Sequence, residues 1–338
     1  MGATSKNTYK LALASLLVSA ALSAQAGITT ENELGKFSVS GDVEFDIDFT
    51  DKNKTDKTDK TDKQEFKQGG RVLVQFAAEH NVSGDRYIGM QAQPLLKTNR
   101  DVDLDDAWFA MGKKADWQLK VGRFEAFDLF PVGQDTMLAY AYADAEPYRA
   151  NAARGRGDNG QLAFSKQLGN VYFEASSLFK KTEENVDADK NAVFLRPVLA
   201  FQATESFRIA GGVEANLTAD KKDADNDFIG YGVTANYSAD ALSLNLNYAF
   251  RDFDTTETKE DSTVGANLLF NGFGLGHIYS QHELMNDKTK QNTTYASYEI
   301  ANVWDVDALN LYLGTYYSKV SDTEDKDLGA RLRIKYFF

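Results

Sequence analysis

The sequence predicts an all-β fold, a transmembrane antiparallel β-barrel of 16 strands around a water-filled lumen. Three observations support this prediction: an export signal at the N-terminus, a period-two alternation of apolar and polar residues, and an amphipathic final segment that ends in phenylalanine. No apolar run of helical length follows residue 22. A chain that crosses a membrane without apolar helices does so as a closed barrel, because lipid cannot satisfy open backbone hydrogen-bonding groups.

The N-terminal residues have the three parts of a secretory signal peptide. A basic start is followed by an apolar run from Leu11 to Leu22 and by a small-x-small cleavage site at Ala24–Ala26. The apolar run is shorter than the roughly 20 residues of a membrane-spanning helix. We expect a signal peptide over 1–26, cleavage after Ala26, an N-terminal extension over 27–35 and one barrel domain over 36–338. The extension either hangs in the periplasm or folds into the lumen as a partial plug.

The period-two pattern is clear between Phe37 and Phe49. Apolar residues and one glycine share one face of this segment, and charged residues and serines share the other. Runs of about ten residues, the length of a tilted membrane-spanning strand, recur along the chain. They include 207–217, 229–237, 242–250, 264–270 and 309–313. The polar face is rich in serine, threonine, asparagine and glycine, which indicates a hydrated lumen wall.

The spacing of the connections sets the strand count. Short and long connections alternate, as expected of periplasmic turns and outer loops. Counting the runs predicts 16 strands with both chain ends in the periplasm. Gly274–Glu283 and Asn292–Asn302 alternate poorly, and without them the count is 14. Either number leaves an aqueous lumen, because a barrel of about eight strands is already filled by its own side chains. Ala330–Phe338 reads as the closing strand, with apolar and basic residues in alternation.

Composition excludes several classes of function. Without the signal peptide the chain has 35 basic and 50 acidic residues, a formal charge of −15. Nucleic-acid binding is excluded, because binding to phosphates requires basic patches. There is no cysteine, so disulfides and thiol chemistry are excluded. The sequence shows no phosphate-binding loop and no metal-ligand spacing, so we expect no cofactor and no metal. The three histidines form no local hydrolase motif. The acidic row from Asp42 to Asp48 is most simply a hydrated wall.

The longest connection, Glu125–Asp158, is the segment expected to carry function. It has 34 residues and is rich in aromatic and charged side chains. Loops of this length are usually functional or disordered. It either folds inward and narrows the pore or packs over the barrel rim. Aromatic faces match the C–H faces of sugar rings, and carboxylates and guanidinium groups bind hydroxyls.

The candidate pore residues belong to the wall and to this connection. They are Asp106, Trp108 and Arg123 on the wall, and Phe127, Asp128, Phe130, Asp135, Arg154 and Arg156 in the loop. Wall arginines that face loop acids would set a transverse field and select solutes by charge.

Three segments resemble the RafY-like glycoporin family, which includes raffinose and cyclodextrin porins of enteric bacteria. They are Gly122–Pro131, Gly133–Thr136 and Ala153–Gly157, and the strand rhythm and terminal phenylalanine extend the resemblance more loosely over the chain. It implies an outer-membrane porin for passive diffusion of oligosaccharides, including bulky or cyclic ones. A general porin without sugar preference, a barrel enzyme and an adhesin are the alternatives. The expected partners are oligosaccharides and the lipid and lipopolysaccharide of the outer membrane, with the chain a monomer or a homotrimer.

Overall fold

The structure is a computed structural model of the chain. It describes residues 27–55, 60–134, 136–141, 146–157, 159–182, 190–218, 227–254, 259–285, 287–321, 323 and 325–338. The predicted signal peptide lies outside the described residues.

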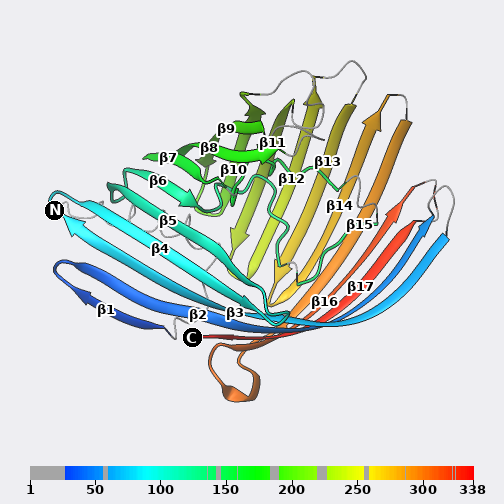
Figure 1. Cartoon of the computed structure of the whole chain (residues 1–338), viewed down its shortest axis with the longest axis horizontal. Coiled ribbons are helices and arrows are strands. Elements are labelled where there is room, and N and C mark those ends of the chain that lie inside the picture. Colours follow the sequence, from blue (N-terminus) through cyan, green and yellow to red (C-terminus); the bar gives the residue numbers. More distant parts are fainter. Residues whose placement is uncertain are drawn as a thin grey trace, which may run out of the picture.

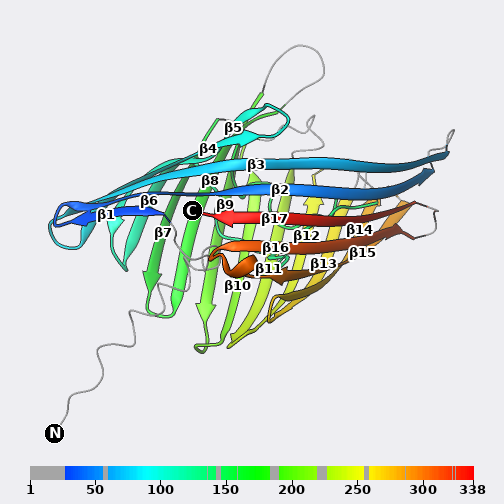
Figure 2. The ribbon, with the colours of Figure 1, turned by 90° about the horizontal axis from the view of Figure 1, so that it is seen from below.

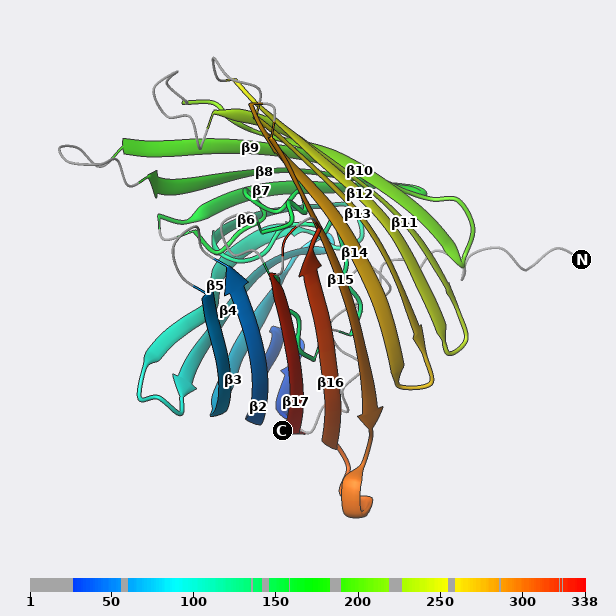
Figure 3. The same cartoon turned by 90° about the vertical axis from the view of Figure 1, so that its right-hand side faces the viewer.

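Sixteen strands, β2 to β17, form a closed antiparallel barrel (Figures 1 and 3). Their bounds are β2 (Gly35–Thr55), β3 (Lys60–Val82), β4 (Arg86–Lys97), β5 (Val102–Lys113), β6 (Trp117–Arg123), β7 (Gln161–Leu168), β8 (Val171–Thr182), β9 (Lys190–Gln202), β10 (Phe207–Asn216), β11 (Phe228–Ala239), β12 (Leu242–Phe253), β13 (Lys259–Phe270), β14 (Phe273–Leu284), β15 (Asp287–Ile300), β16 (Leu309–Val320) and β17 (Lys326–Phe337). Each strand pairs with its sequence neighbour, and β17 pairs with β2 to close the ring. The predicted count of 16 is confirmed.

A short additional strand, β1 (Ile28–Asn32), lies at one rim and pairs with the start of β2. In the register Ile28 is opposite Val39, whereas the last residue of β17 is opposite Asp42. Strand β1 therefore continues the line of β17 along the same edge of β2 (Figure 2). Residues 28–32 neither hang free nor enter the lumen, because the backbone of β2 offers them hydrogen-bonding partners at the rim.

The two faces of the strands have opposite chemistry, as β12 illustrates. Leu246 and Tyr248 point outward and are 64% and 46% exposed, whereas Asn245 and Asn247 point into the lumen and are 5% and 4% exposed. Exposed apolar bands of this size are stable against lipid and not against water. Among the described residues, no helix is long and apolar enough to cross a membrane.

The two segments with poor alternation are strands β14 and β15. Their lumenal faces carry Ile278 and Tyr295, which are 1% and 4% exposed and belong to an apolar cluster inside the barrel. On the outer face His277 and Thr294 are joined by a hydrogen bond of 2.9 Å. The alternation is weak here because the lumenal face packs against protein instead of water.

Strands β2 and β3 extend further than the sequence predicts. They remain paired as far as Thr55 and Lys60, so much of the charged segment Thr50–Gly69, which lacks the apolar alternation, is a β-hairpin arm. Three consecutive Thr-Asp-Lys repeats occupy residues 55–63, of which 56–59 lie outside the described residues. Loss of apolar alternation marks where the strands leave the lipid, and backbone pairing continues beyond that point. Between β15 and β16 the short connection contains a 3-10 turn, η3 (Val303–Asp305).

Candidate functional site

The described part of the connection between β6 and β7 folds into the barrel. Figure 1 shows it as a teal-to-green trace across the inner side of β11 to β15. Leu129, Phe130 and Tyr148 from this loop are 1–3% exposed and pack with wall residues such as Ile278. Full burial of each such side chain contributes about 1.5–3 kcal/mol. The loop therefore lies against the inner wall and narrows the lumen.

The descending half of the loop, which includes residues 131–136, is held through its backbone. Four carbonyl oxygens accept hydrogen bonds from wall side chains of β12, β13, β15 and β17. The donors are Asn247 and Asn267 to Pro131, Tyr295 to Val132, Ser297 to Gln134 and Arg331 to Thr136, at 2.6–3.1 Å. Because peptide carbonyls are strong acceptors that need partners when buried, these bonds fix the path of the loop.

The returning half of the loop, which includes residues 148–153, is held by one buried carboxylate, Glu214 on β10. It accepts hydrogen bonds from the Tyr148 hydroxyl at 2.6 Å and from the backbone N–H groups of residues 152–153 at 3.1 and 3.0 Å. Arg196 on β9 is fully buried, lies 3.5 Å from the same carboxylate and donates to the carbonyl oxygen of Ala150. Burial and the neighbouring Glu214 raise the pKa of Tyr148, so its hydroxyl remains a donor.

A ladder of ion pairs lines the lumen where β17, β2 and β3 meet. It contains four cations and four carboxylates. The pairs are Arg331 with Asp48 at 2.7 Å, Arg333 with Asp46 at 2.8 Å and with Glu44 at 3.0 Å, Lys335 with Glu44 at 3.3 Å, and Arg71 with Asp42 at 3.5 Å. The acidic row of β2 is therefore neutralised by the basic face of the closing strand. Its side chains are too well paired to act as a free acidic wall.

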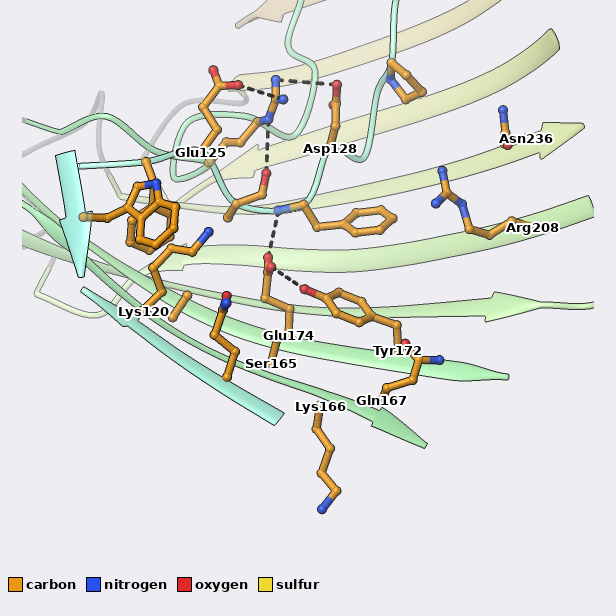
Figure 4. Close-up of a pocket in the computed structure, with 18 of the residues that line it drawn as sticks. Lys120, Glu125, Asp128, Ser165, Lys166, Gln167, Tyr172, Glu174, Arg208 and Asn236 are labelled. Carbon is orange, nitrogen blue, oxygen red and sulfur yellow. Dashed lines mark hydrogen bonds and ion pairs between the residues drawn. The ribbon is translucent and has the colours of Figure 1, made fainter. Parts of the chain in front are cut away.

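On the side of the short turns, the lumen opens into a cavity of about 1610 Å³. Its lining includes loop residues 124–128 and 130–134 and wall residues from β2 to β13. The ring of Phe127 lies 5.8 Å from the ring of Tyr172, and its backbone N–H donates to Glu174 at 2.8 Å. Figure 4 shows Tyr172 and Glu174 projecting from the wall beneath the loop, with Asp128 above them. Aromatic and polar groups thus share one surface of the cavity.

Five of the predicted pore residues line this cavity. They are Trp108, Phe127, Asp128, Phe130 and Arg154. Arg154 forms ion pairs with Glu125 at 3.0 Å and with Asp128 at 3.5 Å. Phe130 is only 3% exposed and serves mainly as an anchor in the apolar cluster.

The other predicted residues have different positions. Asp106 forms an ion pair with Arg156 at 2.9 Å, and Arg156 also contacts Asp105 at 3.0 Å, where the loop rejoins the wall. Arg123 stands opposite Ala107 in the register, on the outward-facing side, and its guanidinium donates to backbone carbonyls at the root of the loop. Arg123 therefore braces the loop and does not line the lumen as expected. Asp135 lies outside the described residues.

Three further wall residues of the cavity were not among the predicted pore residues. Lys120 on β6 lies 4.6 Å above the ring of Trp108, Arg208 on β10 lies 5.5 Å from the ring of Phe127, and Glu174 accepts from the loop. Alternation within their strands places each on the lumenal face, but only the path of the loop shows which lumenal residues share a cavity. No group of three or more potential metal ligands occurs among the residues that the structure describes.

A closed 16-strand barrel with an apolar outer face, a polar lumen and a loop folded inside defines the porin class of outer-membrane protein. A family model described as porin-like glycoporin RafY matches residues 37–338, so the chain belongs to this family. The family and the barrel establish an outer-membrane diffusion porin, and they are those of non-enzymatic channels.

Solved porin structures share the fold. OmpF of Salmonella typhi, in complex with daunomycin, is 14% identical with a TM-score of 0.64, over 92% of this chain and 100% of that chain. OmpT of Vibrio cholerae is 10% identical with a TM-score of 0.68, over 92% and 99%. An anion-selective porin from Comamonas acidovorans is 12% identical with a TM-score of 0.62, over 90% and 100%. None of the curated proteins matches the chain.

Proposed function

We propose that this porin is a passive diffusion channel for oligosaccharides. The observation that carries the proposal is the position of Phe127, which the inward loop holds beside Tyr172 at the surface of the lumenal cavity. Aromatic rings offer flat apolar faces that match the C–H faces of a pyranose. The description of the family as glycoporins supports the same substrate class.

The paired charges of the ladder leave that part of the lumen wall without a strong net field, which supports an uncharged class of solute. The ladder on β2, β3 and β17 contains equal numbers of cations and carboxylates at 2.7–3.5 Å, so its field largely cancels at a distance. The cavity adds uncharged hydrogen-bonding side chains, among them Gln118, Ser165, Asn236 and Asn245. Groups of this kind exchange hydrogen bonds readily with sugar hydroxyls and allow a solute to pass without a deep trap.

Single-channel current in a planar bilayer tests the proposal. Oligosaccharides of increasing size, linear and cyclic, are added to one side, and we expect saturable block. Phe127→Ala should raise the half-blocking concentration about two- to tenfold, from the roughly 0.5–1.5 kcal/mol of an aromatic contact. Phe66→Ala is the matched control, because Phe66 is 79% exposed on the outer face of β3. A large conductance that is indifferent to every oligosaccharide would overturn the proposal and leave a general diffusion porin.

A further inference from the structure

Arg208 is a cation in the cavity without an anionic partner. Its side chain extends from β10 into the cavity, and its guanidinium lies 5.5 Å from the ring centre of Phe127 (Figure 4). The Nε atom is buried and has no hydrogen-bond partner. Within the part of the chain that the structure describes, the group forms no ion pair either. An arginine stays charged at any physiological pH, so a half-buried, unpaired guanidinium is costly unless a ligand pairs with it.

The cross-strand neighbours of Arg208 do not neutralise it. Its cross-strand partners are Gln202 and Asn236, which are uncharged. Their amide nitrogens donate to the carbonyl oxygen of Thr204 at 2.6 Å and to Oδ1 of Asn245 at 2.7 Å, and neither amide oxygen accepts a hydrogen bond from Arg208. The buried carboxylate of the same wall, Glu174, already accepts bonds from the loop backbone and from a tyrosine hydroxyl. The wall therefore presents the guanidinium to the solute.

A second cation adds to the positive charge that the cavity wall presents to the solute. The Nζ atom of Lys120 lies 4.6 Å and 5.0 Å from the ring centres of Trp108 and Phe124, and no described carboxylate forms an ion pair with it. Figure 4 shows Lys120 and Arg208 on opposite sides of Glu174. Both cations are held by aromatic rings, which orient a charge without neutralising it.

We infer that Arg208, together with the adjoining rings of Phe127 and Tyr172, forms a subsite for an acidic oligosaccharide that contains a uronic acid. The inference rests on the proposed function and refines its substrate class. A guanidinium that packs on a ring keeps its in-plane N–H groups for a carboxylate, which it binds through two parallel hydrogen bonds. The carboxylate of a uronic acid projects from the edge of the pyranose, so the sugar face and the charge are recognised side by side. Lys120 lies further along the wall and meets a second acidic unit.

The test compares block by trigalacturonate with block by a neutral trisaccharide, each added to one side of a planar bilayer. The wild-type channel should be half-blocked by trigalacturonate at about tenfold lower concentration, the factor that one charge-assisted pair supplies. Arg208→Gln should remove this preference and leave the neutral block within about twofold, since neutral–neutral hydrogen bonds are weaker. Arg208→Lys keeps the charge but cannot form the two parallel hydrogen bonds of a guanidinium, so its preference for trigalacturonate should be intermediate. Arg86→Gln is the matched control, because Arg86 is an exposed arginine bonded to the Ser83 turn.

The outcomes separate this inference from the proposed function. Equal block by both trisaccharides, or an acid preference that survives in Arg208→Gln, would overturn the uronate subsite and leave the oligosaccharide channel standing. Block by neither would overturn both. If Arg208→Gln does not assemble, salt dependence of the wild type decides: trigalacturonate block should weaken as salt rises, because the pair is screened, while neutral block stays constant. Equal salt dependence for both would count against the subsite.

Discussion

Replacing Glu214 with alanine should release the returning half of the loop from the wall. The change removes the acceptor of three hydrogen bonds of 2.6–3.1 Å and leaves Arg196, which is fully buried, without its carboxylate. Removing one partner of a buried ion pair costs about 3–5 kcal/mol. That corresponds to about two to four orders of magnitude in the equilibrium between attached and detached loop. We expect a wider, noisier channel, with current steps between two levels.

Single-channel recording of matched variants checks this prediction. Adding Arg196→Met to Glu214→Ala should recover much of the quiet state, since no buried charge is then left unpaired. Glu65→Ala is the control: its ion pair with Lys63 at 3.3 Å is largely exposed, and such pairs contribute about 0–1 kcal/mol. A Glu214→Ala channel with wild-type current and noise would refute the argument that this carboxylate holds the loop.

Two further substitutions test the loop. Replacing Arg154 and Arg156 together with alanine leaves the loop and wall carboxylates that they neutralise, so the reversal potential in a salt gradient should shift toward cation selectivity; an unchanged potential would place these charges outside the ion path. Gly265→Ala places a Cβ atom 2.6 Å from the ring of Phe130, an overpacking that costs about 1–3 kcal/mol and should also raise current noise. Gly69→Ala, where a Cβ meets nothing within 4 Å, should behave like the wild type, and equal noise in the two variants would contradict the packing argument.

Much of the barrel is predictable from the sequence because one rule acts on every strand. Each strand separates lipid from water, so Leu246 and Asn247 are assigned to opposite faces by position alone. The alternation weakens only where the lumenal face packs against the loop and does not contact water. Ile278 and Tyr295 are apolar because the loop covers them, and that contact joins segments that are far apart in the chain. The same contact that blurs the pattern is evidence for the inward loop.

The candidate site is less predictable, because it depends on register and on long-range pairing. Arg123 carries a charge in the motif before the loop, yet the register places it opposite Ala107 on the outward-facing side. Glu214, which holds the loop, is 66 residues from Tyr148, and a lone glutamate in an alternating strand resembles any lumenal acid. Lys120 and Arg208 were likewise indistinguishable from other wall cations until the loop brought aromatic rings over them.

The wall holds the descending half of the loop through the carbonyl oxygens of the loop backbone. Attachment of the loop therefore depends on its backbone, whereas selectivity depends on its side chains. Asparagine, tyrosine, serine and arginine donors on the barrel recognise a backbone path that any residue of the right conformation can follow. Side chains on this stretch are therefore free to change over evolution without loss of the anchor, apart from buried ones such as Phe130. One barrel can in this way serve different solutes by exchanging a few loop side chains, and grafting such residues between related channels is a direct route to altered selectivity.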